Sequence, residues 1–207
     1  MRDKFGNFCM VIGAALVLGA LALFLYNQQE ANQAEQSSME LVEQLVEELE
    51  GIEDATLPLE YVGVPLEFLD PSAFEMTEVE IDGYFYIGYL SIPAIDLELP
   101  IMSDWDYDKL RVAPCRYYGS VMGENLVLMA HNYRSHFGPI SRLKEGDSVI
   151  FTDMDGIVTE YEVVTQDVLD PYAVEEMTAG DFDLTLFTCT YGGRSRVTVY
   201  CDIVKND

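Results

Sequence analysis

The feature that most constrains this chain is an uncharged run of nineteen residues, residues 8–26, near its N-terminus. At about 1.5 Å of rise per residue, a helix of this length crosses the roughly 30 Å hydrocarbon core of a bilayer. A cleaved signal peptide has a shorter apolar core and a cleavage site of small residues, whereas bulky polar residues from Asn27 onward follow this run. The run therefore predicts an uncleaved transmembrane anchor, with a signal peptide as the less favoured interpretation.

The basic residues near this run predict its orientation. Arg2 and Lys4 precede it, and no Lys or Arg follows it before Lys109. Because basic flanks stay on the cytoplasmic side of a membrane, residues 1–7 are expected in the cytoplasm. The rest of the chain is then outside, so we expect a single-pass protein of the cell membrane with an extracellular domain.

The chain is strongly acidic, with 37 Asp and Glu against 11 Lys and Arg and a formal net charge of −26. We expect no nucleic acid partner, because the phosphate backbone needs a basic face. Residues 27–80 hold fifteen acids and no Lys or Arg, which predicts an acidic extracellular stalk and lead-in. Within this segment, apolar residues at helical spacing predict a helix over residues 35–51 that packs on the domain or a partner, with Gly51 at its end.

From residue 81 onward, short β-like segments alternate with turn signals, and little helix is predicted beyond a short turn at residues 104–111. Seven or eight short strands predict an all-β domain over residues 81–207, either a closed barrel or a sandwich. The most strand-like segments are residues 84–90, 97–101, 126–130, 148–152, 160–169, 183–188 and 196–204.

The four cysteines are Cys9, Cys115, Cys189 and Cys201. Three of them lie outside the predicted anchor, so at least one external thiol is expected to be free, while pairing of Cys115 with Cys201 stays open. No C-x-x-C spacing is present, which argues against a structural zinc site.

Polar residues with catalytic chemistry follow two of the predicted strands. His131 comes directly after LVLMA and Cys189 after LTLFT, while Arg194 and Arg196 lie before the last strand. If the strands are neighbours, all of these side chains emerge at one rim. A thiolate needs a nearby base or cation, and the carbonyl it attacks needs a donor for its developing charge. The sequence therefore predicts a nucleophilic thiol site.

The segments TLFTC (residues 185–189) and RVTV (residues 196–199) resemble the signature of sortases, the cysteine transpeptidases of Gram-positive cell surfaces. The segment LMAHN (residues 128–132) is similar to the histidine segment of that family. The resemblance implies a closed sortase-like barrel, with Cys189 as nucleophile, His131 as general acid/base, and an arginine that holds substrate and stabilises the oxyanion.

The resemblance favours Arg196 for this last role, with Arg194 as the alternative because the loop after Cys189 is shorter than is usual in sortases. It implies cleavage of an LPxTG-type sorting motif near the C-terminus of an exported protein, through a Cys thioester. An amine of a peptidoglycan precursor or a pilin then accepts the acyl group. The chemistry requires no metal and no cofactor. The short loop and Asn132 favour class B or class D.

A lid around Asp70, Pro71 and Phe74 is a further possibility that the resemblance raises. A second hypothesis is a non-catalytic, membrane-tethered β-domain that binds or supports a surface complex. A third, a peptidoglycan L,D-transpeptidase, is disfavoured, because that family places histidine and glycine immediately before its cysteine. Here Phe187 and Thr188 occupy those positions.

Overall fold

A computed structural model of the chain describes residues 2–49 and 75–205. It divides into two compact units, Met1–Gln33 and Ala34–Asp207. The predicted end of the helix at Gly51 and the lid residues Asp70, Pro71 and Phe74 fall outside the described residues.

One helix, α1 (Arg2–Leu49), runs from the first unit into the second. The sequence analysis predicted an anchor and a separate helix from residue 35, but residues 27–49 contain neither Pro nor Gly, so nothing interrupts the backbone hydrogen bonds. In the first unit the apolar side chains that are described are exposed, as Leu16 and Phe24 illustrate. Among the described residues α1 is the one helix long and apolar enough to cross a membrane, with a mean hydropathy of 2.1 over its most apolar 18 residues.

Within the second unit, the last turns of α1 pack on the barrel. Leu41 and Leu45 are buried in a cluster with Tyr86, Met102 and Cys115. Burial of each leucine contributes roughly 1.5–3 kcal/mol. The predicted helix therefore packs on the domain, as expected from its apolar spacing.

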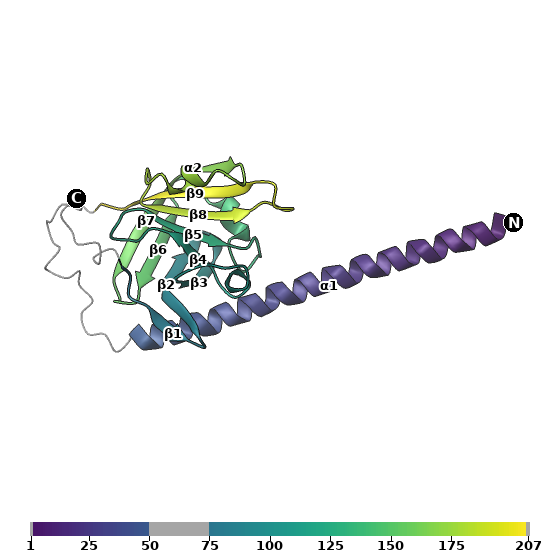
Figure 1. The fold of residues 1–207 in the computed structure, drawn as a ribbon, viewed down its shortest axis with the longest axis horizontal. Helices are drawn as coiled ribbons and strands as arrows, with labels where there is room; N and C mark the ends of the chain where they lie inside the picture. The colour runs from purple at the N-terminus through teal and green to yellow at the C-terminus, as the bar shows by residue number, and fades with distance from the viewer. Residues whose placement is uncertain (1, 50–74, 206–207) are drawn as a thin grey trace. The chain divides into compact units, whose positions relative to one another are not determined.

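Nine strands and four short helical elements make up the rest of the described chain (Figure 1). The strands are β1 (Val79–Ile81), β2 (Tyr84–Ile92), β3 (Leu97–Met102), β4 (Cys115–Tyr118), β5 (Leu126–Ala130), β6 (Ser148–Asp153), β7 (Val158–Leu169), β8 (Leu184–Cys189) and β9 (Arg196–Ile203). The short helices are η3 (Pro93–Ile95), η4 (Lys109–Arg111), η5 (Gly138–Arg142) and α2 (Val174–Thr178).

The strands form one sheet in the order β1-β2-β3-β4-β5-β8-β9-β7-β6, and β6 pairs back onto β2. This second pairing closes an eight-stranded barrel, β2 to β9, with β1 added as a hairpin partner of β2. The prediction of a closed barrel of seven to eight strands is confirmed, and the sandwich is wrong. Closure removes the exposed sheet edges that a flat sheet would present.

Gly88 allows β2 to lie between β3 and β6. Its φ is +145°, and a Cβ there would overlap the carbonyl oxygen of Thr152 on β6. The register with β3 shifts between Tyr86 and Gly88, which indicates a bulge at the same place. The close approach of β2 and β6 therefore requires glycine.

The barrel interior is filled by apolar side chains from every long strand and from η5. On β8, Leu184 and Leu186 point into this core, whereas Phe187 belongs to a separate cluster outside the barrel with Val127 and Met177. Alternation of side chains along a strand produces this division into an inner and an outer face. The inner face belongs to the main core, and the outer face of β8 carries a second, smaller buried cluster.

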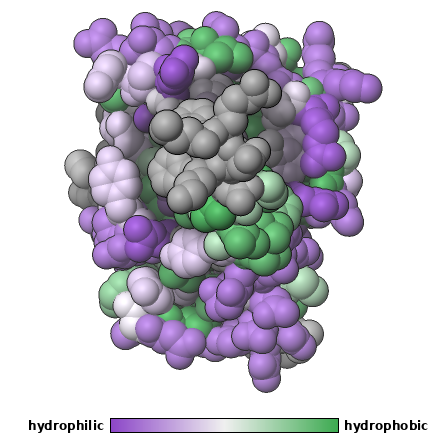
Figure 2. Space-filling view, turned by 90° about the vertical axis from the view of Figure 1, so that its right-hand side faces the viewer, coloured by the Kyte–Doolittle hydropathy of each residue, from purple (hydrophilic) through white to green (hydrophobic). Residues whose placement is uncertain are grey.

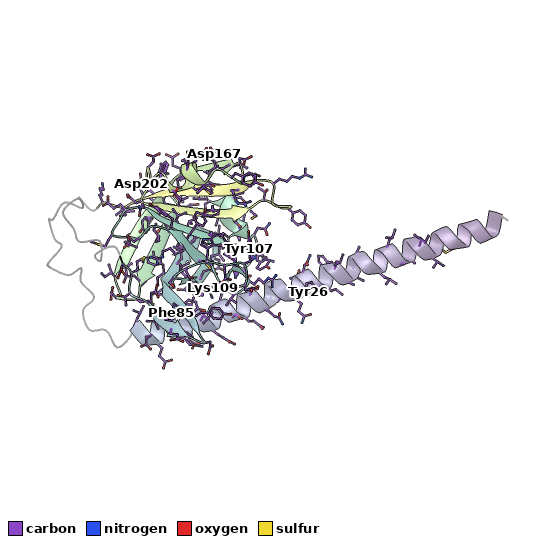
Figure 3. The ribbon with its side chains drawn as sticks, viewed as in Figure 1. Tyr26, Phe85, Tyr107, Lys109, Asp167 and Asp202 are labelled. Carbon is purple, nitrogen blue, oxygen red and sulfur yellow. The ribbon has the colours of Figure 1, made fainter. Side chains whose placement is uncertain are left out.

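The surface of the barrel reflects the acidic composition. Figure 2 shows one face on which hydrophilic residues predominate. Asp167 and Asp202 project from β7 and β9 at the outer surface (Figure 3), and both are exposed. Repulsion among such carboxylates favours solubility of this part of the chain.

Candidate active site

The parallel pairing of β5 and β8 places the predicted histidine beside the predicted cysteine. Ala130 is the register partner of Thr188, and the Thr188 hydroxyl donates a hydrogen bond of 2.8 Å to the Ala130 carbonyl. One residue further along each strand are His131 and Cys189, at the same end of the sheet. Figure 1 shows β5, β8 and β9 as neighbouring strands.

The antiparallel pairing of β8 and β9 adds the arginine. Cys189 and Arg196 are direct register partners, so they lie on the same face of the sheet. Val127 and Phe187, which precede His131 and Cys189 by even numbers of residues, lie on the outer face of their strands. The three predicted residues therefore lie at one end of the barrel, and Cys189 and Arg196 share one face of the sheet.

The loop between β8 and β9 is short and internally hydrogen-bonded. The Thr190 N–H donates to the Ser195 carbonyl at 2.9 Å, and the Gly193 N–H donates to the Thr190 carbonyl at 2.8 Å. Gly192 and Gly193 have φ values of +84° and +71°, which residues with a side chain rarely adopt. The two glycines thus let a six-residue loop return the chain so that Arg196 lies opposite Cys189.

Of the two candidate arginines, Arg196 is the half-buried one and Arg194 is exposed in the loop. A guanidinium nitrogen of Arg196, Nη1, donates to the Ser195 carbonyl at 3.3 Å and to the Gly193 carbonyl at 3.5 Å. These contacts hold Arg196 against its own loop. Arg196 was favoured over Arg194 because it was expected to begin the last strand, and β9 does begin at Arg196.

The three cysteines of the barrel, Cys115, Cys189 and Cys201, are free, and they differ in exposure. Cys115 and Cys201 are fully buried, while Cys189 is partly exposed at the end of β8. Burial raises the pKa of the Cys115 thiol to about 12 and also raises the pKa of Cys201. Neither buried thiol is available as a thiolate near neutral pH, which leaves Cys189 as the accessible nucleophile among them.

The loop after β5 holds His131 in place. The Phe137 N–H donates to the His131 carbonyl at 3.2 Å, and the Phe137 side chain is fully buried in the barrel core. The His131 imidazole is half-buried, and its ring centroid lies 4.9 Å from that of Tyr133. The buried Phe137 side chain therefore anchors the turn that begins at His131, the residue that lies at the site.

His136, the second histidine of the chain, had no predicted role. It is fully buried, and burial, together with the nearby His131, lowers its pKa to about 4. The segment HNYRSH, residues 131–136, contains no apolar periodicity that would have predicted the burial of His136. The neighbouring Phe137 is the signal that was available, because it draws this part of the loop into the core.

Aromatic side chains line the outer face that leads to Cys189. Phe187 contacts Tyr117 with ring centroids 5.2 Å apart, and Tyr117 contacts Trp105 at 5.7 Å. Trp105 and Tyr107, the latter labelled in Figure 3, lie on the segment between β3 and β4. Phe187 itself is buried, whereas Trp105 and Tyr107 are exposed at the outer end of this row of aromatic rings. Within the described ranges, no group of three or more His, Cys, Asp or Glu is placed to hold a metal ion.

A barrel of this topology with a cysteine, a histidine and an arginine at adjoining strand ends has clear relatives. Residues 90–204, more than half of the chain, match the family described as Sortase domain. The chain belongs to the sortase family. It is accordingly a cysteine transpeptidase, and the prediction of an enzyme is confirmed. The hypothesis of a non-catalytic β-domain is no longer needed.

Individual relatives come from several branches of the family. Sortase A of Bacillus anthracis is 31% identical over 150 residues, which cover 65% of this chain and 70% of that protein. The structure of Streptococcus pneumoniae sortase C has a TM-score of 0.61 at 24% identity, and the match covers 81% of this chain and 97% of the other.

The sortase D5 transpeptidase of Clostridium perfringens has a TM-score of 0.58 at 20% identity, covering 82% of this chain and 99% of the other. At such identities the two structures show the shared fold alone. Class B or class D membership therefore stays a prediction.

Proposed function

We infer that Cys189 is the nucleophile of a transpeptidation that proceeds through a thioester. The Cys189 thiolate attacks a backbone carbonyl of the substrate, and the oxyanion then collapses with release of the C-terminal fragment as an amine. His131 donates the proton that this amine requires. An incoming amine attacks the thioester, loses a proton to His131, and releases the Cys189 thiolate, so that one amide bond replaces another.

Arg196 stabilises the oxyanion in both steps and holds the substrate backbone. A guanidinium remains charged and presents several donors in a fixed fork, which suits two carbonyl oxygens at once. Its position directly opposite Cys189 in the β8–β9 register supports this assignment over Arg194. The common placement of Cys189, Arg196 and His131 is the observation that carries the proposal.

The substrates in this proposal are exported proteins with an LPxTG-type sorting motif. The acceptor is an amine of a peptidoglycan precursor or of a pilin. The work on the S. pneumoniae sortase C names pilin substrates for that protein, and sortases in general act on sorting-motif proteins. The exposed Trp105, which packs through Tyr117 on Phe187 of the strand that ends at Cys189, supports binding of a peptide with apolar side chains.

The proposed topology is single-pass. Residues 8–26 cross the cell membrane, residues 1–7 are cytoplasmic, residues 27–80 form the extracellular stalk and lead-in, and residues 81–207 carry the chemistry. The exposed apolar surface of the first unit supports the anchor, and Arg2 and Lys4 support its orientation.

The test uses the full chain in detergent micelles with a library of sorting-motif peptides and a small amine. Mass spectrometry should detect an acyl-Cys189 adduct and then the amide product. The Cys189→Ala variant should form neither, while Cys201→Ala, which alters a buried thiol, should form both. Product formation by Cys189→Ala at the rate of the unaltered chain would refute the assignment.

A further inference from the structure

We propose that Tyr133 is a positioning residue for His131, and that the buried His136 ring supports Tyr133 in this task. The inference rests on the proposed role of His131 as general acid/base. It concerns three aromatic side chains of one loop, referred to below as the histidine-loop stack: His131, Tyr133 and His136.

Tyr133 contacts both imidazole rings. Its ring centroid lies 4.9 Å from that of His131, with 34° between the ring planes, and 5.3 Å from that of His136, with 45°. These distances fall in the range of favourable aromatic pairs. Because Tyr133 is half-buried and His136 is fully buried, the stack runs from the site into the protein.

The backbone of the same loop fixes the stack. The Tyr133 carbonyl accepts hydrogen bonds from the N–H groups of His136, at 3.1 Å, and Gly138, at 2.9 Å. A Cβ at Gly138 would come within 2.5 Å of that carbonyl oxygen, so the turn depends on glycine. With Phe137 anchored in the core, the loop has little freedom to move Tyr133 away from His131.

His136 is unusual for a buried imidazole. Neither ring nitrogen makes a well-formed hydrogen bond to the described residues, although the Val112 backbone lies near enough to favour the protonated ring in part. The effect of burial is larger than that of the Val112 backbone and lowers the pKa of His136 to about 4, so the ring is uncharged near pH 7. A neutral ring adds no charge that would oppose protonation of His131.

The stack has two expected effects on His131. Contact with the Tyr133 ring restricts the imidazole to fewer orientations, which favours proton transfer along one direction. The π face of Tyr133 also attracts a cation and therefore favours the imidazolium. Loss of the Tyr133 ring should then lower the pKa of His131 by about half a unit.

The activity test compares Tyr133→Leu, which removes the ring, with Tyr133→Phe, which keeps it. We expect kcat/KM for a sorting-motif peptide to fall about tenfold in Tyr133→Leu and to stay within about twofold in Tyr133→Phe. His136→Leu should lower kcat/KM less than Tyr133→Leu does. His136→Phe, which keeps a ring at this position, should have the kcat/KM of the unaltered chain. Tyr172→Leu, at a tyrosine that is 89% exposed, is the matched control and should change nothing.

A second readout follows the ring of His131 directly. The chain has only two histidines, so 13C labelling of histidine in the full-length Cys189→Ala variant gives two ring signals, and His136→Phe assigns them. Tyr133 and His136 are the titratable groups that face this ring, and Cys189 and Arg196 lie at the same end of the barrel. In Tyr133→Leu the His131 midpoint should fall by about half a pH unit, and Tyr133→Phe should restore it.

The two readouts separate this inference from the proposed function. If the unaltered chain turns over no sorting-motif peptide, the proposed substrate is wrong, and the titration alone decides the role of Tyr133. If Tyr133→Leu does not fold by circular dichroism, Tyr133→Gln replaces it under the same criteria. A folded ring-deletion variant with an unchanged His131 midpoint and an unchanged kcat/KM would overturn the inference.

Discussion

At the scale of single residues, side chains of one type differ sharply because of where the strands place them. Cys189 ends β8 on the outer face, while Cys201 faces the core from β9. Arg196 lies opposite Cys189, and Arg194 lies two residues earlier in the exposed loop. In each of these two pairs, substitution of the residue away from the site is a control for substitution of the residue at the site.

Substitution of the two arginines should separate their roles. We expect Arg196→Lys and Arg196→Ala to lower kcat by roughly 10²–10³, the usual effect of losing an oxyanion donor. Arg194→Ala should change kcat only a few-fold, because an exposed charge is weakly coupled to its surroundings. Steady-state kinetics measures this, with circular dichroism as the folding control. A severe loss in Arg194→Ala with near-normal Arg196→Ala would show that Arg194 is the functional arginine.

His136 should make the fold sensitive to acid. Its pKa is about 4 in the folded chain and near 6.5 when unfolded, so between these values the unfolded state binds the proton more readily. The free energy of unfolding should therefore be unaffected by this group above pH 6.5 and fall by up to about 3 kcal/mol as the pH drops to 4.

The measurement is urea unfolding at several pH values, compared with His136→Phe, which carries no titrating ring. The variant should lose less stability than the unaltered chain over the same interval. Parallel pH profiles for the two proteins would mean that His136 is protonated equally in the folded and unfolded states.

At the scale of elements, much of the barrel was predictable because its long strands carry strong local patterns. All seven of the strand-like segments correspond to strands in the structure, with half of their ends matched and the other half shifted by one or two residues. The strands that were not predicted are β1 and β4. β1 has only three residues, and β4 has only four, among them Arg116, whose Nε donates to the Ser103 carbonyl at 2.7 Å.

The site was predictable only in part, for a related reason. His131, Cys189 and Arg196 stand at strand ends that local patterns reveal, but their proximity depends on pairing between β5 and β8, whose paired residues are 58 positions apart. Only the resemblance to the sortase family predicted that these strand ends lie side by side. The stack beneath His131 was missed because the burial of His136 follows from tertiary packing and not from its polar local sequence.

The end of helix α1 offers a test of how elements hold together. Leu45 is fully buried against the barrel, and Leu45→Ala should lower the free energy of unfolding by about 2–5 kcal/mol through lost burial and the resulting cavity. Met39→Ala, at an exposed position of the same helix, should change it by less than about 0.5 kcal/mol. Equal effects in thermal or urea unfolding would mean that this helix segment does not pack on the barrel in solution.

At the scale of the whole molecule, the two units of the chain differ in chemistry. The first presents exposed apolar side chains along a single helix, and the second buries its apolar residues in a closed barrel with an acidic surface. An apolar surface of this extent is stable in lipid and not in water. The chain therefore joins a membrane-compatible unit to a water-compatible one.

We expect the full chain to stay with membranes after an alkaline carbonate wash and to keep its N-terminus. A variant beginning at Ala34, the start of the second compact unit, should instead appear in the supernatant. Immunoblotting with an N-terminal tag and N-terminal sequencing measure both outcomes. A main product in the medium that begins beyond Tyr26 would favour the signal-peptide interpretation.

The parallel pairing of β5 with β8 also has a consequence for how the enzyme matures. In the proposed mechanism no local piece of the chain contains a complete site, since Cys189 and His131 come to the same end of the sheet only after a long loop has closed, at an entropic cost that grows with loop length. Folds rich in such distant contacts form slowly. Catalytic competence should therefore appear abruptly, in step with barrel closure, and a newly made chain should remain chemically silent toward sorting motifs until that moment.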